Sequence, residues 1–293
     1  MEQRDIDRIV EAVAQRIRER VGAAAPAPHV CSASAETCAA CGDCASRRPE
    51  DVGRIVQLGA ARVASAPNVT GVRTDLARFI DHTLLAPDAT QEQLRKLCEE
   101  AKRFGFYSVC VNSANVAFCR SLLAGTPVKV VAVVGFPLGA MSPGAKAFET
   151  REALQAGAEE VDMVLNIGEL KSRQYARVLE DIRKVVDAAR PRAVKVILET
   201  SKLTATEKII ACALSKAAGA RFVKTSTGFG GGGATAEDVA LMKEVVGPDM
   251  EVKASGGVRT IADAQAMIAA GATRIGASAS VEIVQGKTAK TAY

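Results

Sequence analysis

The sequence predicts an α/β protein: one eight-stranded barrel preceded by an N-terminal extension. The chain has 293 residues and is 48% hydrophobic, which is enough for a single core of about 250 residues with an appendage. From about Thr74 onward, eight short apolar and β-branched runs alternate with longer segments of helical period. This alternation implies parallel strands covered on both faces, and eight repeats close a barrel.

The extension is predicted to consist of a helix and a linker. Within residues 1–21, apolar residues recur at three- and four-residue spacing, which predicts an amphipathic helix. Gly22 and the AAAPAP stretch end this helix and begin a flexible linker over residues 22–73. Two interpretations of the helix remain open, a frayed tail or a docking helix whose apolar stripe binds another protein.

The linker contains four of the eight cysteines in a C-x6-C-x2-C-x2-C pattern: Cys31, Cys38, Cys41 and Cys44. Thiolates at two-residue gaps can hold a metal ion or an iron–sulfur cluster. A zinc ribbon, however, pairs two C-x2-C knuckles across a longer gap. The alternative is a redox-sensitive thiol patch, and neither interpretation is expected to serve the chemistry of the barrel.

The predicted (β/α)8 (TIM) barrel spans residues 74–293. Its strands begin near Phe79, Tyr107, Val128, Glu160, Ala193, Arg221, Met250 and Thr273. Helical segments such as 91–105, 207–220 and 261–272 lie between them, each closed by glycine as helix ends prefer. The alternative is an open doubly wound sheet, but no glycine-rich dinucleotide turn follows the first strand. The remaining cysteines stand singly among apolar neighbours and are predicted core residues: Cys98, Cys110, Cys119 and Cys212.

Charge and hydropathy exclude some partners. The net charge of +5 comes from 38 basic and 33 acidic residues spread along the chain, and aromatic residues are few, so nucleic acid is not an expected partner. No apolar run approaches the roughly 20 residues needed to cross a bilayer, and the N-terminus lacks an apolar signal segment. We therefore expect no membrane partner and a cytoplasmic location.

Polar residues embedded in the apolar runs indicate the site, because reacting groups of such barrels project from the C-terminal ends of strands. They are Asp81, Thr83, Asp162, Asn166, Lys195, Glu199, Lys224 and Lys253. Lys224 and Lys253 are 29 residues apart, close to one repeat, so neighbouring strands bring both into one cavity. Burial and a like charge then lower the pKa of one lysine, leaving an amine that attacks carbonyls. The alternative is a buried ion network without catalysis, with Asp162 or Glu199 as partners.

The other candidate residues follow from position. Asp162 faces the same cavity if its strand alternates, and a carboxylate there can move protons during Schiff-base chemistry. Asp81 is a candidate for orienting water or Lys253. Small residues after the last two strands predict a phosphate site, because glycines let backbone N–H groups approach an anion. The substrate-binding candidates are Gly228, Gly256, Gly257, Gly276 and Ser278, together with Lys195.

Over residues 74–293 the chain closely resembles the deoxyribose-phosphate aldolase family. The matching motifs are FIDHTLLAPDAT, VCVNSANV, VAVVGFPLGA, AKAFET, GAEEVDMVLNIG, VKVILET, RFVKTSTGFG, VKASGGVRT and RIGAS. The resemblance implies a Schiff base on Lys224, a second lysine at Lys253 that perturbs it, and proton transfer by Asp162. It also implies that Asp81 and Thr83 belong to the hydrogen-bond network, and that Tyr293 is a C-terminal tyrosine that assists proton transfer.

By the same resemblance, the reaction is reversible cleavage of 2-deoxy-D-ribose 5-phosphate to D-glyceraldehyde 3-phosphate and acetaldehyde, without a metal or organic cofactor. A homodimer is the expected assembly. Phe229 and Ala279 depart from some relatives, which have a basic residue and a serine there. The rival functions are a transaldolase-like enzyme or sugar-phosphate isomerase that binds phosphate, and a non-catalytic cargo scaffold.

The first segment resembles another class of sequence. A helix over residues 1–21 followed by an Ala/Pro tether is similar to the encapsulation peptides that recruit enzymes into bacterial microcompartments. The resemblance implies a shell protein as partner and a location inside such a compartment, whose shell would retain a volatile aldehyde.

Overall fold

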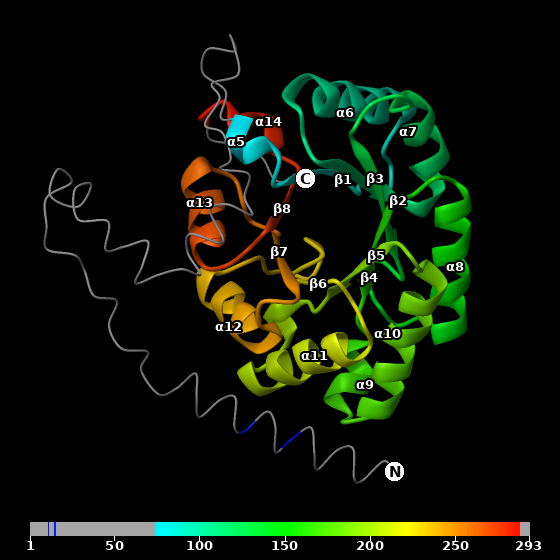
Figure 1. The fold of residues 1–293 in the computed structure, drawn as a ribbon, viewed down its shortest axis with the longest axis vertical. Coiled ribbons are helices and arrows are strands. Elements are labelled where there is room, and N and C mark those ends of the chain that lie inside the picture. The colour runs from blue at the N-terminus through cyan, green and yellow to red at the C-terminus, as the bar shows by residue number, and fades with distance from the viewer. Residues whose placement is uncertain (1–10, 12–14, 16–73, 288–293) are drawn as a thin grey trace, which may run out of the picture. The chain divides into compact units, whose positions relative to one another are not determined.

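The computed structural model describes Glu11, Gln15 and residues 74–287, and it confirms the predicted barrel. Figure 1 shows the strands as an inner ring and the helices around it. All eight neighbouring strand pairs are parallel, and β8 pairs with β1 to close the ring. The strands are β1 Ile80–Leu84, β2 Ser108–Asn112, β3 Lys129–Val134, β4 Glu160–Val164, β5 Ala193–Ile197, β6 Phe222–Lys224, β7 Glu251–Ser255 and β8 Arg274–Ala277.

Helices connect the strands along the outside of the ring. They are α5 Thr74–Ala77, α6 Gln91–Phe104, α7 Val116–Leu122, α8 Pro143–Gln155, α9 Ile167–Lys171, α10 Tyr175–Ala189, α11 Ala205–Ala217, α12 Ala236–Val246, α13 Ile261–Ala269 and α14 Ser280–Val284. Threonine begins several of them: Thr90, Thr204 and Thr260 each form a reciprocal capping box with the third residue of the helix. These side chains satisfy backbone N–H groups that a helix leaves without partners, and so fix where each helix starts.

Two groups of apolar side chains form the core. The larger group lies between the outer face of the sheet and the helices, which explains why the outward-facing residues of the strands are apolar. The smaller group lies on the inner face of the sheet and consists of Leu85, Cys110, Val131 and Val133, with Phe136 against it. Its members follow or belong to β1, β2 and β3, so the opposite part of the barrel interior is free for polar side chains.

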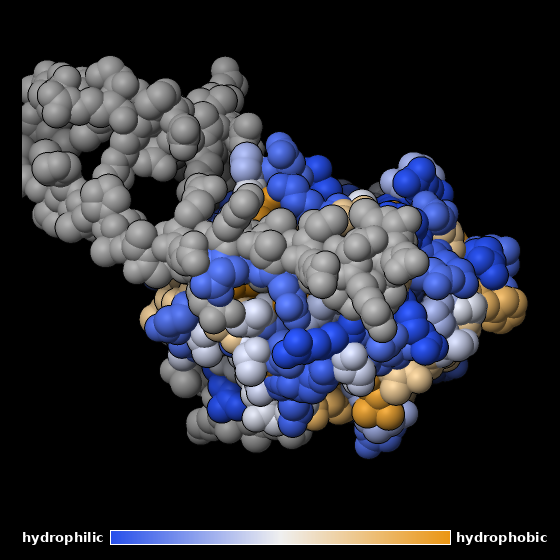
Figure 2. Space-filling view, turned by 90° about the horizontal axis from the view of Figure 1, so that it is seen from below, coloured by the Kyte–Doolittle hydropathy of each residue, from blue (hydrophilic) through white to orange (hydrophobic). Residues whose placement is uncertain are grey.

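The four cysteines predicted as core residues are buried and unbridged: Cys98, Cys110, Cys119 and Cys212. No described helix is long and apolar enough to cross a membrane. Figure 2 shows one face of the molecule, where polar side chains predominate between smaller apolar areas. The large apolar side chains that are exposed are Leu138, Met141, Phe148 and Phe229.

Several predictions concern residues outside the described part. Glu11 and Gln15 are both helical, and the other residues of the predicted 1–21 helix lie outside the described residues. The same is true of the linker with Cys31, Cys38, Cys41 and Cys44, and of Tyr293. These predictions stay open.

Candidate active site

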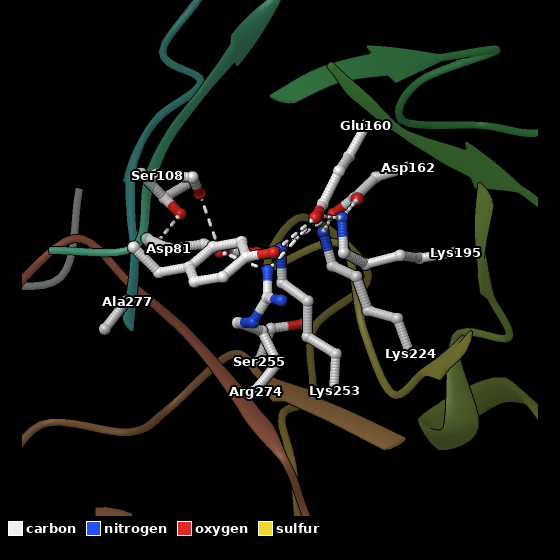
Figure 3. Close-up of polar contacts among 12 residues, drawn as sticks. Asp81, Ser108, Glu160, Asp162, Lys195, Lys224, Lys253, Ser255, Arg274 and Ala277 are labelled. Carbon is white, nitrogen blue, oxygen red and sulfur yellow. Dashed lines mark hydrogen bonds and ion pairs between the residues drawn. The ribbon is translucent and has the colours of Figure 1, made fainter. Parts of the chain in front are cut away.

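Seven charged side chains converge inside the barrel, and none is more than 5% exposed. They are Asp81 of β1, Glu160 and Asp162 of β4, Lys195 of β5, Lys224 of β6, Lys253 of β7 and Arg274 of β8. Alternation along the strands explains this placement, because residues two apart on a strand point to the same face. Figure 3 shows the side chains meeting from opposite sides of the barrel.

Asp162 lies at the centre of this charged cluster and accepts hydrogen bonds from three lysines. Its Oδ1 accepts from Lys195 at 2.8 Å. Its Oδ2 accepts from Lys224 at 2.9 Å and from Lys253 at 2.8 Å. Lys224 and Lys253 are paired in the β6–β7 register, which places their side chains side by side. The fold therefore brings Lys224 and Lys253 into contact with Asp162.

The other two carboxylates extend the cluster. Asp81 accepts from Lys253 at 2.5 Å, from Arg274 at 2.9 Å and from the Ser108 hydroxyl at 2.6 Å. Glu160 forms ion pairs with Lys195 at 2.6 Å and Arg274 at 3.1 Å. Each carboxylate is thus surrounded by donors, as burial of a charge requires.

The cations are not equivalent. Lys195, Lys253 and Arg274 each form ion pairs with two carboxylates of the cluster. Lys224 forms its ion pair with Oδ2 of Asp162, and Lys253 pairs with the same oxygen. Three carboxylates and four cations leave one excess positive charge when every group is ionised.

The pKa shifts follow from these contacts. Burial alone would raise the pKa of Asp162, but the charges of its three lysines outweigh burial and hold the pKa well below the ordinary value. For Lys253, burial alone would lower the pKa, but Asp162 and Asp81 outweigh it and raise the pKa above the ordinary value. The predicted repulsion between the lysines is therefore overcome at Lys253, which keeps its proton.

A cavity of about 360 Å³ opens above the charged cluster. Of the seven charged side chains, Lys224 lines it and the other six do not. The prediction that Lys253 and Asp162 face this cavity with Lys224 was therefore wrong, because both are fully buried and pair with each other below the cavity. The predicted small residues Gly228, Gly256, Gly257, Gly276 and Ser278 all line it, as does Thr83. Arg259 adds a positive charge to the wall.

Lys195 differs from its predicted place as a substrate-binding residue. Its side chain is fully buried, pairs with Glu160 and Asp162, and does not belong to the cavity lining. The reason is register: Lys195 is paired with Phe222 of β6, whereas Lys224 is paired with Ile197 at the C-terminal end of β5. Lys195 therefore lies one layer below the amine that reaches the cavity.

Sequence reasoning missed Glu160, Arg274 and Ser108. A signal was present, because Glu160 lies two residues before Asp162 and Arg274 lies two residues before Gly276, so each shares the inward face of its strand. All three stand at the first positions of their strands. The search for polar residues at the C-terminal ends of strands passed over them.

The fold and the buried cluster of amines and carboxylates below a cavity define a (β/α)8-barrel enzyme. A family model described as DeoC/LacD family aldolase matches residues 76–286. The chain belongs to this family of aldolases. Among the described residues, no group of three or more His, Cys, Asp and Glu side chains could hold a metal ion.

Individual relatives agree with the family. The chain is 59% identical over 219 residues to a deoxyribose-phosphate aldolase of Alkaliphilus oremlandii, a match that covers 74% of this chain and 99% of the relative. It is 61% identical over 220 residues to that of Halalkalibacterium halodurans, covering 74% and 98%. A solved deoxyribose-phosphate aldolase from Aeropyrum pernix, described as a tetramer, matches with a TM-score of 0.69 and 35% identity, covering 79% of this chain and 95% of the other.

Proposed function

We propose that the chain is a deoxyribose-phosphate aldolase that cleaves 2-deoxy-D-ribose 5-phosphate reversibly through a Schiff base on Lys224. The observation that carries the proposal is that Lys224 lines the cavity while its charged partners lie below it. An amine in this position meets a carbonyl, and its partners can exchange protons without contacting bulk water. The names of relatives that are 59% and 61% identical support the choice of substrate.

The first step forms the imine. Lys224 in its neutral form attacks C1 of the open-chain aldehyde, and the carbinolamine loses water to give an iminium ion. Lys253 stays cationic beside it because Asp162 and Asp81 raise the pKa of Lys253. Asp162 shares one oxygen between the two amines and is placed to pass protons.

The second step breaks the C2–C3 bond. Loss of the proton from the C3 hydroxyl releases glyceraldehyde 3-phosphate, and the bonding electrons move toward the iminium nitrogen to leave an enamine. Protonation of the enamine carbon and hydrolysis of the imine then release acetaldehyde and restore Lys224. We assign the proton transfers to Asp162 and Lys253, with Asp81 and Thr83 holding the network. Tyr293 is proposed to assist from the C-terminal end of the chain.

The phosphate is assigned to the wall made by Gly228, Gly256, Gly257, Gly276 and Ser278, which line the cavity. Backbone N–H groups at glycines can approach an anion closely. Arg259 lines the same cavity and would add charge attraction. A substrate carbonyl at Lys224 and a phosphate at this wall would then share one cavity, which supports the assignment.

Borohydride trapping tests the proposal. Incubation with acetaldehyde and borohydride should leave one ethyl group on Lys224, located by mass spectrometry of peptides. The variant Lys224→Leu should show no adduct and no cleavage, whereas Lys96→Leu, whose side chain is 75% exposed, should behave as wild type. An adduct-free wild type would refute the proposal and favour a sugar-phosphate isomerase.

We further propose that residues 1–21 recruit the enzyme to a bacterial microcompartment shell. The predicted amphipathic helix and the Ala/Pro tether support this role. Deletion of residues 1–21 should leave cleavage intact and abolish association with shell proteins. Association that survives the deletion would contradict the proposal.

A further proposal concerns the four cysteines of the linker. We propose a metal ion or iron–sulfur cluster on Cys31, Cys38, Cys41 and Cys44, to be tested by elemental analysis of the purified chain against a variant with all four replaced by serine. Equal metal content in the two proteins would contradict the metal site and favour the redox-sensitive thiol patch.

We propose that the chain forms a homodimer. Sedimentation equilibrium distinguishes a dimer from a tetramer such as the one described for the Aeropyrum pernix relative.

A further inference from the structure

The loop between β6 and α12 forms much of the cavity wall but has few side chains to hold its shape. Thr227, Gly228 and Gly231 to Gly233 line the cavity. Glycine has no side chain to pack, and it loses more conformational freedom on ordering than any other residue. The shape of this loop must therefore be imposed by neighbouring residues.

Glu199 is the neighbour that meets this loop, and its backbone is unusual. It follows β5, is 3% exposed, and has a φ of 57°, in the left-handed region that residues with a Cβ rarely adopt. Residues on either side are tied to β6: Leu198 N donates to Lys224 O at 2.9 Å, and Thr200 N donates to Thr225 O at 3.0 Å. A non-glycine residue persists in such a conformation only when its surroundings fix it, and functional sites are where such residues gather.

The carboxylate of Glu199 holds the start of the loop. Its Oε2 accepts hydrogen bonds from the backbone N–H of Thr227 at 3.2 Å and from the Thr227 hydroxyl. The Thr227 hydroxyl oxygen in turn accepts from Phe229 N at 2.9 Å. Oε1 is buried without a hydrogen-bond partner among the described residues, so the hydrogen bonds of this carboxylate run through Thr227.

The rest of the loop is shaped around the same side chain. A Cβ added at Gly230 would lie 2.5 Å from Glu199 Cδ, so the loop backbone rests directly on the carboxylate. A Cβ at Gly233 would lie 2.5 Å from Gly256 O in the loop after β7. Ala234 N donates to that same oxygen at 2.9 Å. The loop is thus held at its start by Glu199 and at its end by the backbone after β7.

We propose that Glu199 is a positioning residue for substrate binding: it fixes the loop 227–233 as the wall that contacts the phosphorylated part of the substrate. It does not touch the reacting atoms, because it does not line the cavity and Lys224 pairs with Asp162 instead. The inference rests on the proposed function for the identity of the substrate. Loss of Glu199 should therefore weaken binding of the phosphorylated substrate and leave Schiff-base formation with acetaldehyde intact.

Steady-state kinetics of Glu199→Ala, Glu199→Gln and the control Glu152→Ala, on the exposed face of α8, test this assignment. Glu199→Ala should raise KM for deoxyribose phosphate about tenfold, the cost of hydrogen bonds lost from the wall, with kcat changed by less than about twofold. Glu199→Gln keeps an acceptor for Thr227 and should restore most of the loss. Borohydride trapping with acetaldehyde should proceed equally in all variants. A fall in kcat and in trapping with unchanged KM would overturn the inference.

Hydrogen–deuterium exchange gives a second measurement that does not depend on activity. In Glu199→Ala, the peptide covering residues 225–235 should exchange faster, while peptides from β1 to β5 stay protected as in wild type. Glu199→Gln and Glu152→Ala should leave that peptide unchanged. Equal exchange in Glu199→Ala and wild type would overturn the inference. If wild type did not cleave deoxyribose phosphate, the proposed function would be wrong. Hydrogen–deuterium exchange of residues 225–235 would still test whether Glu199 holds the loop.

Discussion

At the scale of single residues, Asp162 combines a structural and a chemical task. It balances three buried ammonium groups, and it is the group through which Lys224 is connected to the rest of the cluster. A buried carboxylate with several cationic donors has a lowered pKa, and this is the direction at Asp162. Asp162, Lys224 and Lys253 were predicted as site residues because each is a polar residue embedded in an apolar strand. The prediction took Lys253 as the cationic neighbour of Lys224, and the structure gives the cause, because Lys253 pairs with Asp81 of β1 as well as with Asp162.

The variant Asp162→Asn should lose activity and stability together. A neutral amide leaves Lys195, Lys224 and Lys253 short of negative charge and removes the proton shuttle. We expect kcat to fall about 10²- to 10⁴-fold and the free energy of unfolding to fall by about 3–5 kcal/mol. Steady-state kinetics and urea unfolding measure the two effects. Wild-type turnover in this variant would exclude Asp162 from the mechanism.

At the scale of elements, β8 has no room for a side chain at Gly276, where it passes Lys253. A Cβ added at Gly276 would lie 2.9 Å from Lys253 Cε and 3.0 Å from Ser255 Cβ. The glycine therefore gives Lys253 the room in which it pairs with Asp81 and Asp162. From sequence, Gly276 was predicted as a phosphate-binding residue because of its place near the end of the last strand. Its packing against Lys253 came from the β7–β8 pairing.

The variant Gly276→Ala should push Lys253 from its place. We expect a loss of about 1–3 kcal/mol in the free energy of unfolding from overpacking, and slower borohydride trapping at Lys224. Gly144→Ala in α8 is the matched control, because its added Cβ meets no atom within 4 Å. It should stabilise the chain by about 0.4–1 kcal/mol. Differential scanning calorimetry compares the two. Equal melting temperatures would show that β8 can move to admit the methyl group.

At the scale of the whole molecule, closure of the barrel brings together charges that are distant in sequence. Arg274 of β8 contacts both Asp81 of β1 and Glu160 of β4. These pairs make the fold itself sensitive to pH, because neutralising Asp81, Glu160 or Arg274 leaves a buried partner without its opposite charge. The carboxylates have lowered pKa values, and Lys195, Lys253 and Arg274 have raised ones.

Stability should therefore be highest on a broad plateau. For Asp81, Glu160 and Asp162, the stabilising contribution is fully present above the ordinary pKa values of 3.8 and 4.5 and is lost as pH falls below them. For Lys195 and Lys253 it is fully present below the ordinary value of 10.5 and is lost as pH rises above it. Urea midpoints measured from pH 3 to pH 11 check this expectation. A steep change between pH 6 and pH 8 would contradict it.

The sequence by itself determined the eight strands, the helices between them and three central site residues. These follow from local periodicity, since a strand buried on both faces is apolar and each polar residue within it is conspicuous. Only the tertiary structure decided which amine reaches the cavity, why Lys195 lies below it, and that Glu160 and Arg274 join the cluster. Such facts depend on strand register and barrel closure, which set contacts between residues more than a hundred positions apart. A local pattern can mark Glu160 and Arg274 as inward-facing, but it does not say which distant side chains they meet.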